Sequence, residues 1–362
     1  MASPESTESG GDGHDGGLHA PSHWAAAAAA AEAAETADAD ADANDSGLDS
    51  ASTTTSSASI SSSILEYRII HGRTYHADRG GAQYWASNDD QANETLDLIH
   101  HASTLSLGDK LHLAPLDRPR TRRVLDLGTG TGIWAVDFAD EFPAAEVTGT
   151  DISPIQPSWV PPNLKFEMED FTQAWTFRED EFDYVHMRYL YGSVTDWAGL
   201  FRQAYRACAP GGWVESYEGS PTLLSDDGTL EEGSAMAEWG KFFYEGARKL
   251  GRVFSPLPDH LQERYMEEAG FVDVQVSTMK VPVGDWAKNP RLKEIGRFIQ
   301  LSVETDLEGI VQFMAGLLEG WSPEDIMLYG AQLRREFRAK KTHAYYLQRV
   351  VWAQKPETAS KS

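Results

Sequence analysis

The segment from Val124 to Gly132 constrains the fold more than any other. It reads Val-Leu-Asp-Leu-Gly-Thr-Gly-Thr-Gly, so a short stretch suited to a buried strand leads into three glycines at every second position. Trp134, Val136 and Phe138 follow at a spacing typical of an opening helix. Glycines let backbone N–H groups approach a ligand, and a helix start adds the positive end of a dipole. The segment therefore predicts a nucleotide-cradling turn.

Two residues narrow the choice of ligand. Ile133 stands where a pyrophosphate-binding Gly-x-Gly-x-x-Gly motif would place its third glycine, and Asp126 lies in the strand just before the turn. A carboxylate there repels a diphosphate but suits a ligand that carries an amino group, such as S-adenosylmethionine. A nicotinamide-dependent oxidoreductase shares the glycines and stays an alternative.

Five strand-like runs, of which the strand before the glycines is the first, predict the fold class. They cover residues 123–127, 146–150, 164–168, 182–187 and 212–217, with helical or loop connections between them. This alternation predicts an α/β protein with a Rossmann-like, doubly wound, mostly parallel sheet. Helices are expected over about 290–340, and a last strand over 345–353 is expected to run antiparallel at the sheet edge.

The chain divides into five expected regions. Residues 1–60 contain eleven Asp or Glu and no Lys or Arg, so we expect a disordered, acidic, low-complexity tail. A helical N-terminal cap is expected over 61–118, with short helices and loops, and the core over 119–280. A helical lid is expected over 281–341, and the final edge strand over 342–356.

The charge balance bears on partners and location. The net charge is −25, and subtracting the tail's −11 leaves −14 for the rest, which argues against direct nucleic-acid binding. No apolar segment is long enough for a membrane span, and the alanine run from Ala25 to Ala31 lacks the basic flank of a signal peptide. The single cysteine, Cys208, fits a reducing compartment. We therefore expect an intracellular protein of the cytoplasm or nucleus that is not secreted and has no membrane partner.

The carboxyl ends of the predicted strands supply candidate ligand contacts, because ligands of open parallel sheets collect there. Asp151 can accept hydrogen bonds from both ribose hydroxyls, although an Asp there also suits a turn or helix cap. Asp170 and Phe171 offer an acceptor for an adenine amine beside an aromatic face. The predicted cofactor-binding residues are Tyr75, Asp126, Gly128, Thr129, Gly130, Gly132, Asp151, Ile152, Asp170 and Phe171.

These residues, with Pro210-Gly-Gly212, resemble the class I S-adenosylmethionine-dependent methyltransferases across about residues 120 to 220. A narrower resemblance, over roughly residues 61 to 356, is to the LaeA-like methyltransferases of filamentous fungi. The segments that carry it are Ser61-Ser-Ser-Ile64, Gly72-Arg-Thr-Tyr-His76, Phe182-Asp-Tyr-Val-His-Met-Arg-Tyr189, Pro210-Gly-Gly212 and Ala269-Gly-Phe271. The resemblance implies a methyltransferase of fungal secondary metabolism with a small-molecule methyl acceptor. It also allows a nuclear regulator of gene expression that works with a velvet-domain partner.

Methyl transfer needs positioning, exclusion of water and sometimes a base. His186 and Arg188 lie toward the ligand-side end of one strand, and Glu215 lies at a comparable place on the next. We expect His186 to accept a proton or Arg188 to orient an acidic group, with Glu215 as partner; a buried polar network between the two strands is the alternative. Aromatic walls for the sulfonium are expected from Tyr75, Tyr84, Tyr189 and Tyr191.

Overall fold

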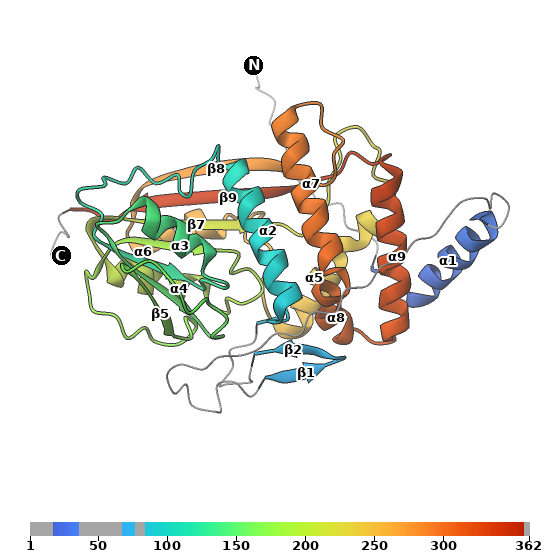
Figure 1. Cartoon of the computed structure of the whole chain (residues 1–362), viewed down its shortest axis with the longest axis horizontal. Helices are drawn as coiled ribbons and strands as arrows, with labels where there is room; N and C mark the ends of the chain where they lie inside the picture. Colours follow the sequence, from blue (N-terminus) through green and yellow to red (C-terminus); the bar gives the residue numbers. More distant parts are fainter. Residues whose placement is uncertain (1–16, 36–66, 77–83, 358–362) are drawn as a thin grey trace, which may run out of the picture.

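The computed structural model describes residues 17–35, 67–76 and 84–357, and its centre is a seven-stranded sheet (Figure 1). The strands lie in the order β5-β4-β3-β6-β7-β9-β8 across the sheet. They are β3 (Arg123–Leu127), β4 (Glu146–Asp151), β5 (Leu164–Met168), β6 (Phe182–Arg188), β7 (Cys208–Gly219), β8 (Val272–Pro282) and β9 (Tyr345–Gln354). Strands β3 to β7 run parallel, which confirms the predicted fold class.

The central strand β3 explains where a ligand can bind. Val124 to Leu127 are all buried, because β3 lies between β4 and β6 and both faces of the sheet are covered. The chain leaves β3 toward β4 and later returns to form β6 on the other side. In open α/β sheets, the crevice beyond the carboxyl ends of the strands at such a reversal is the usual ligand site.

Helices cover both faces of the sheet. Helix α3 (Ile133–Glu141) packs on one face through Trp134 and Phe138, which contact the cluster around Val124. Helices α4 (Trp197–Ala207) and α6 (Leu261–Ala269) pack together on the opposite face. The burial of apolar side chains on both faces holds the strand ends, and hence the site, in a fixed arrangement.

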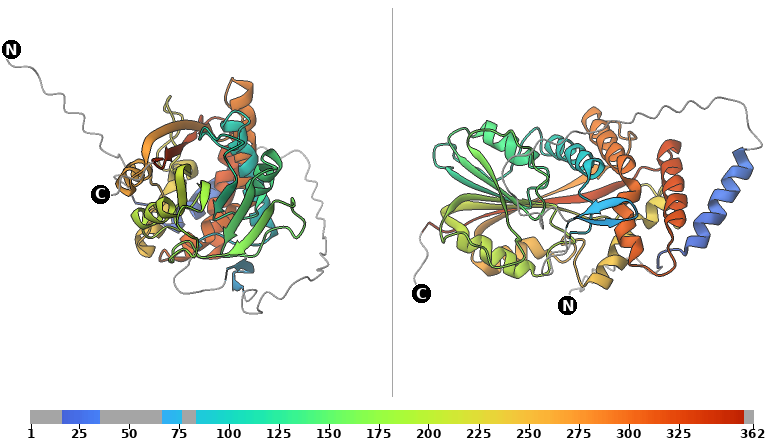
Figure 2. Two further views of the ribbon diagram at one scale, coloured as in Figure 1. Left: turned by 90° about the vertical axis from the view of Figure 1, so that its left-hand side faces the viewer. Right: turned by 60° about the horizontal axis from the view of Figure 1, so that its bottom comes forward.

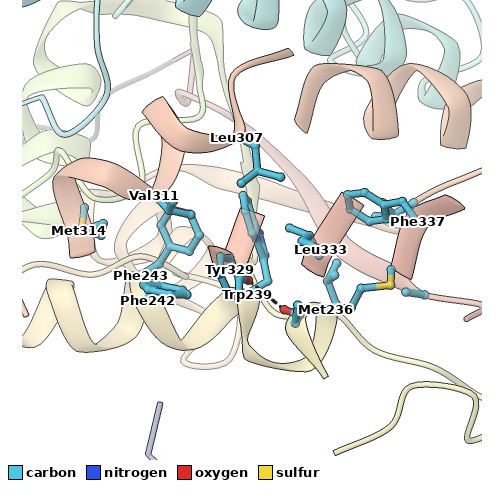
Figure 3. Close-up of a cluster of buried hydrophobic side chains, with 14 of the residues drawn as sticks. Met236, Trp239, Phe242, Phe243, Leu307, Val311, Met314, Tyr329, Leu333 and Phe337 are labelled. Atoms are coloured by element: carbon cyan, nitrogen blue, oxygen red, sulfur yellow. Dashed lines mark hydrogen bonds between the residues drawn. The ribbon is translucent and has the colours of Figure 1, made fainter. Parts of the chain in front are cut away.

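A helical unit stands at one end of the sheet (Figure 2). It contains α5 (Ala235–Leu250), α7 (Pro290–Thr305), α8 (Leu307–Gly316) and α9 (Pro323–Ala339), and α2 (Asp90–Ser106) packs along α7. The apolar faces of these helices form a cluster of their own, in which Trp239 of α5 lies near Leu333 of α9 (Figure 3). Helix α9 begins at a capping box in which Ser322 and Asp325 bond to each other's backbone N–H, as the sequence Ser-Pro-Glu-Asp favours.

The N-terminal region differs from the expectation in two places. Arg68–Ile70 (β1) and Arg73–Tyr75 (β2) form an antiparallel hairpin where short helices and loops were expected, because the left-handed backbone at His71 and Gly72 makes a two-residue turn. Within the expected tail, Pro21–Glu35 forms helix α1, since alanine is the strongest helix former and Trp24 is buried. Most of the rest of the expected tail lies outside the described residues.

The position of the last strand was predicted wrongly. Strand β9 is antiparallel, as expected, but it lies between β7 and β8, so β8 is the edge strand. Its sequence agrees with an inner position, because Val350, Val351 and Ala353 are fully buried, whereas Val272 and Val276 of β8 are exposed.

Candidate active site

A cavity opens at the carboxyl ends of β3, β4 and β6, where the strand order reverses. Of the residues predicted to bind a cofactor, eight line it: Asp126, Gly128, Thr129, Gly130, Asp151, Ile152, Asp170 and Phe171. We call this space the cofactor cavity. Gly132 lies behind its wall and Tyr75 lies elsewhere.

The glycine turn owes its shape to backbone that only glycine adopts easily. Gly128, Gly130 and Gly132 have φ of 67°, 58° and 80°, in the left-handed region. A Cβ at Gly132 would also overlap the ring of Phe166 from β5. Gly132 therefore serves packing at the start of α3, whereas Gly128 and Gly130 form the cavity wall.

Asp151 links the glycine turn to the end of β4. Its carboxylate oxygens accept hydrogen bonds from the backbone N–H groups of Gly130 and Ser153, both at 2.9 Å. Burial raises the pKa of Asp151 to about 6, and these two hydrogen bonds oppose the rise. The N–H of Ile152 is a third backbone donor to this carboxylate, which holds the turn and lines the cavity, where it can accept a further hydrogen bond from a ligand.

Asp126 and His186 form a buried pair across β3 and β6. Nδ1 of His186 lies 2.7 Å from Oδ1 of Asp126, and Thr129 donates its hydroxyl to the other oxygen at 2.5 Å. The imidazole stacks on Trp134 with ring centroids 3.7 Å apart. Burial lowers the pKa of His186, although the Asp126 carboxylate opposes the shift, so the ring is neutral near pH 7. Its Nε2 has no hydrogen-bond partner among the described residues, and the residue lines the cofactor cavity.

Arg188 ends β6 and is the cationic side chain in the lining of this cavity over the described part of the chain. Its guanidinium contacts Nδ1 of His100 at 3.1 Å and lies over the ring of Tyr189, 5.6 Å from the centroid. Among the described residues it has no carboxylate partner within ion-pair distance. A guanidinium placed in this way can bind an anionic group of a ligand.

After β6 the chain turns sharply at Tyr189, between the cofactor cavity and a second cavity described below. Tyr189 has φ of 56°, an uncommon left-handed conformation for a bulky side chain. Glu218 of β7, fully buried, accepts hydrogen bonds from the N–H groups of Leu190 and Tyr191 at 3.0 and 3.1 Å. The hydroxyl of Tyr189 bonds to Ser103 and Gln348. These contacts hold the strained turn in place.

A second cavity lies beside the first, between the end of the sheet and the helical unit. The two share five wall residues: Tyr84, Ser87, Leu96, Ile99 and Tyr189. The remaining wall is mainly aromatic and aliphatic and includes Trp85, Tyr191, Trp239, Phe243 and Phe337. Among the described residues that line it, Asp306 is the charged one, and it is paired with Arg73. We call this space the acceptor cavity, since it adjoins the ends of the same strands.

Comparison with known proteins agrees with this geometry. A family described as "Methyltransferase domain" matches residues 98–276. "Methyltransferase pytC" of Aspergillus terreus is 41% identical over 301 residues, which cover 82% of this chain and 90% of that protein. "Secondary metabolism regulator laeA" of Aspergillus flavus is 33% identical over 290 residues, covering 79% of this chain and 77% of that protein. The protein of the same name from Monascus pilosus is 34% identical over 290 residues, which cover 79% of this chain and 77% of that protein.

This chain belongs to the LaeA-like methyltransferases. It is therefore an S-adenosylmethionine-dependent methyltransferase with the class I fold. None of the described helices is long and apolar enough to cross a membrane.

The cofactor cavity of this LaeA-like methyltransferase fits S-adenosylmethionine in its chemistry. The cofactor supplies a methyl group on a cationic sulfonium, and it also carries an ammonium, a carboxylate, two ribose hydroxyls and adenine. Both amide atoms of Asn88 and the hydroxyl of Ser193 are buried without a hydrogen-bond partner among the described residues, and both residues line this cavity. Buried polar groups of this kind usually have a partner, which a polar ligand can provide.

Two predicted site residues are not brought to the site. Tyr75 is fully buried on β2 and packs against Phe313 of α8, so the prediction that it binds the cofactor was wrong. Glu215 lines neither cavity; its carboxylate accepts hydrogen bonds from the N–H groups of Leu113 and Ala114, at 2.9 and 2.6 Å. Its predicted role as partner of His186 or Arg188 is therefore not seen, because the backbone of Leu113 and Ala114 occupies the carboxylate.

Sequence reasoning missed Asn88, Ser193, Leu96 and Ile99. Leu96 and Ile99 were not singled out, because nothing in their spacing reveals that α2 lies beside the glycine turn. Asn88 stands just before the Asp that caps α2, where a polar residue is common in any loop. Of the predicted aromatic walls, Tyr84 and Tyr189 line both cavities and Tyr191 lines the acceptor cavity.

Proposed function

We propose that this protein methylates a neutral, largely apolar small molecule of fungal secondary metabolism, bound in the acceptor cavity. The observation that carries this proposal is the shared wall of Tyr84, Ser87, Leu96, Ile99 and Tyr189, which joins an aromatic cavity to the cofactor cavity. Apart from the paired Asp306, the described lining of the acceptor cavity is uncharged, which disfavours an ionic acceptor. The relative named as a methyltransferase, pytC, supports an enzymatic role.

We assign parts of the cofactor to particular groups. Asp151 receives the ribose hydroxyls, Asp170 with Phe171 receives the adenine, and the backbone of Gly128 and Gly130 passes close to the cofactor. The guanidinium of Arg188 binds the carboxylate of the methionine portion, since it is a cation without a carboxylate partner among the described residues. The negative charge of Asp126 favours the ammonium nearby.

We propose His186 as the group that receives the proton when the acceptor loses one. Asp126 orients the neutral ring through Nδ1, which leaves Nε2 able to accept a proton from an acceptor hydroxyl that reaches from the acceptor cavity into the cofactor cavity, whose wall contains His186. The alternative is a purely structural pair between β3 and β6. Changing His186 to Ala separates them: as a base, its loss lowers kcat and removes the acidic limb of the pH profile, while the affinity for S-adenosylhomocysteine stays the same. Unaltered turnover at saturating cofactor would leave only the structural role.

The methyl acceptor can be identified directly. Strains with and without the gene are grown on isotopically labelled methionine, and their metabolites are compared without preselection. We expect one metabolite, or a small related group, to lose one labelled methyl group when the gene is absent. An unchanged set of labelled metabolites would argue against an enzymatic role on a small molecule.

A regulatory role is the second candidate, because relatives from Aspergillus flavus and Monascus pilosus are named as regulators of secondary metabolism. In that case the protein works in the nucleus beside a velvet-domain partner rather than in the cytoplasm. Affinity purification of the full chain would then recover such a partner, and deletion would lower many metabolites together. Loss of a single methyl group from one metabolite, with no such partner, is the outcome expected of the enzyme.

A further inference from the structure

A segment that lines neither cavity is held by specific contacts that methyl transfer does not explain. Residues 17–24, just before and at the start of α1, lie along α5 and α9. The backbone N–H of Leu18 donates to Glu245 at 2.9 Å, and Lys241 donates to the carbonyl of Gly17 at 3.2 Å. Both partners lie on α5, so the segment is bound through its backbone at two points.

His19 makes the most specific contact. Its backbone N–H donates to Oε2 of Glu238 at 2.7 Å, and its Nδ1 lies 2.5 Å from Oε1 of the same carboxylate. Glu238 is fully buried, and Lys241 is its third partner, at 2.9 Å. Two of the three groups that satisfy this buried charge therefore come from the N-terminal segment. A buried carboxylate without such donors is costly, so this contact discriminates between peptides.

Trp24 provides the apolar anchor. Its side chain is 1% exposed and meets Tyr329 of α9 edge to face, with ring centroids 5.1 Å apart. Phe242 of α5 contacts the same tyrosine ring at 4.8 Å, and Figure 3 shows Phe242 and Tyr329 close together. A deeply buried indole beside a satisfied polar pair is the usual composition of a binding hot spot.

We propose that this surface of α5 and α9 is a peptide-binding site, and that its ligand is the Leu18-His19…Trp24 segment of the same chain. The site recognises an aliphatic residue followed by a histidine and, five positions later, a tryptophan. Covalent attachment makes the binding intramolecular, so the effective concentration of the segment is high and a free peptide binds only when the segment has left. This proposal does not depend on which molecule receives the methyl group.

The test uses the full-length chain and residue-resolved hydrogen exchange. In the unaltered chain we expect the amides of Leu18 and His19 to be protected, because both are donated to α5 carboxylates. Trp24→Ala and His19→Ala should each lower that protection at least tenfold. Ser22→Ala, at an exposed position of α1, should leave it unchanged. These variants alter the segment and not the helices that receive it.

A peptide of residues 17–35 provides the second arm. We expect it to bind the full-length Trp24→Ala chain at least tenfold more tightly than the unaltered chain, and a peptide that carries Trp24→Ala should lose this binding. Glu238→Gln in the receiving helix should also weaken it, provided that the variant still binds S-adenosylhomocysteine normally. Equal exchange at Leu18 and His19 in the unaltered and Trp24→Ala chains, or equal peptide binding by both, would overturn the proposal.

Discussion

At the scale of single residues, the charged groups of the site differ in how well the protein itself compensates their charge. Asp126 and Asp151 are bonded to neighbouring side chains or backbone amides, whereas Arg188 contacts only His100 and the ring of Tyr189 among the described residues. A guanidinium in such a place gains most from an anionic ligand, since its charge is not already compensated. The binding of the cofactor is therefore expected to respond more to Arg188 than to exposed arginines.

Changing Arg188 to Met should weaken binding of S-adenosylhomocysteine about 10- to 100-fold, because a hydrogen bond to a charged group contributes roughly 1.5–3 kcal/mol. Isothermal titration calorimetry measures the affinity. Arg202→Met is the matched control, since Arg202 is exposed and pairs with Asp196 at the surface. Equal affinities of the Arg188 variant and the control would show that the guanidinium does not meet the cofactor.

Glu218 gives a prediction about pH. Burial raises the pKa of its carboxyl to about 8, although the N–H groups of Leu190 and Tyr191 oppose the rise. Between its ordinary value near 4.5 and pH 8 the folded chain therefore binds more protons here than the unfolded chain, so this group's contribution to stability falls as pH rises through that window. Glu218→Gln cannot ionise and lacks this dependence.

The free energy of unfolding of the unaltered chain in urea, minus that of Glu218→Gln, should therefore be lower at pH 9 than at pH 6 by about 1 kcal/mol or more. Glu267→Gln, at an exposed position on α6, should show the same small difference at both values. A difference that does not change with pH would mean that Glu218 is already ionised at pH 6.

The sequence predicted the acidic residues at the strand ends of the site, but not the contacts of Glu215 and Tyr75. Asp126, Asp151 and Asp170 were placed correctly in the cavity wall, because the end of a buried strand can be read from a local pattern. Glu215 ends in a loop contact with Leu113 and Ala114, and Tyr75 faces α8. Those contacts join segments remote in sequence, and no local pattern specifies them.

At the scale of elements, the limits of most strands and of several helices follow from local signals. Arg123–Leu127 and Leu164–Met168 have the predicted bounds, and Leu261–Ala269 ends at Gly270 in the left-handed conformation, as a terminal glycine favours. The hairpin of β1 and β2 was missed because its strands are three residues long, too short for an alternating pattern. Helix α1 was missed because its acidic surroundings suggested disorder.

The start of α9 offers a test at this scale. Ser322→Ala removes both hydrogen bonds that the serine hydroxyl makes with Asp325, so the free energy of unfolding should fall by about 1 kcal/mol. Ser158→Ala, in an exposed loop, should change it by less than about 0.5 kcal/mol. Urea denaturation followed by circular dichroism measures both, and equal values would contradict the assigned cap.

At the scale of the whole molecule, the side chain of Arg73 joins the N-terminal hairpin to α2 and to the helical unit. Arg73 pairs with Asp89 at the start of α2 and with Asp306 between α7 and α8, and it donates to Ser87 at 3.0 Å. A Cβ at Gly309 would overlap both Arg73 and Asp306, so the glycine makes room for this pair. Ser87 lies in the wall of both cavities, and Asp306 lies in the wall of the acceptor cavity. The contacts of Arg73 with these two residues therefore stabilise the wall of the acceptor cavity.

Arg73→Met should leave the buried carboxylate of Asp306 and the partly buried carboxylate of Asp89 without their cation, and lower the free energy of unfolding by about 3 kcal/mol. It should also speed hydrogen exchange in residues 68–75 and in the segment around Asp306. Arg297→Met, which breaks an exposed pair with Asp285, should have little effect on either. Normal exchange in both segments of the Arg73 variant would show that the hairpin is held by other contacts.

The inner position of β9 has a consequence for the order in which the chain can fold during synthesis. The ribosome releases β8 before α7, α8 and α9, but the neighbour of β8 in the sheet is β9, which follows all three helices. Until residues 345–354 emerge, β7 lacks its outer partner and β8 has no strand to pair with, so a newly made chain exposes unpaired edges that invite aggregation. A stop codon before Tyr345 would accordingly detach β8 as well as remove β9, and such a chain would depend on chaperones from the moment of its release.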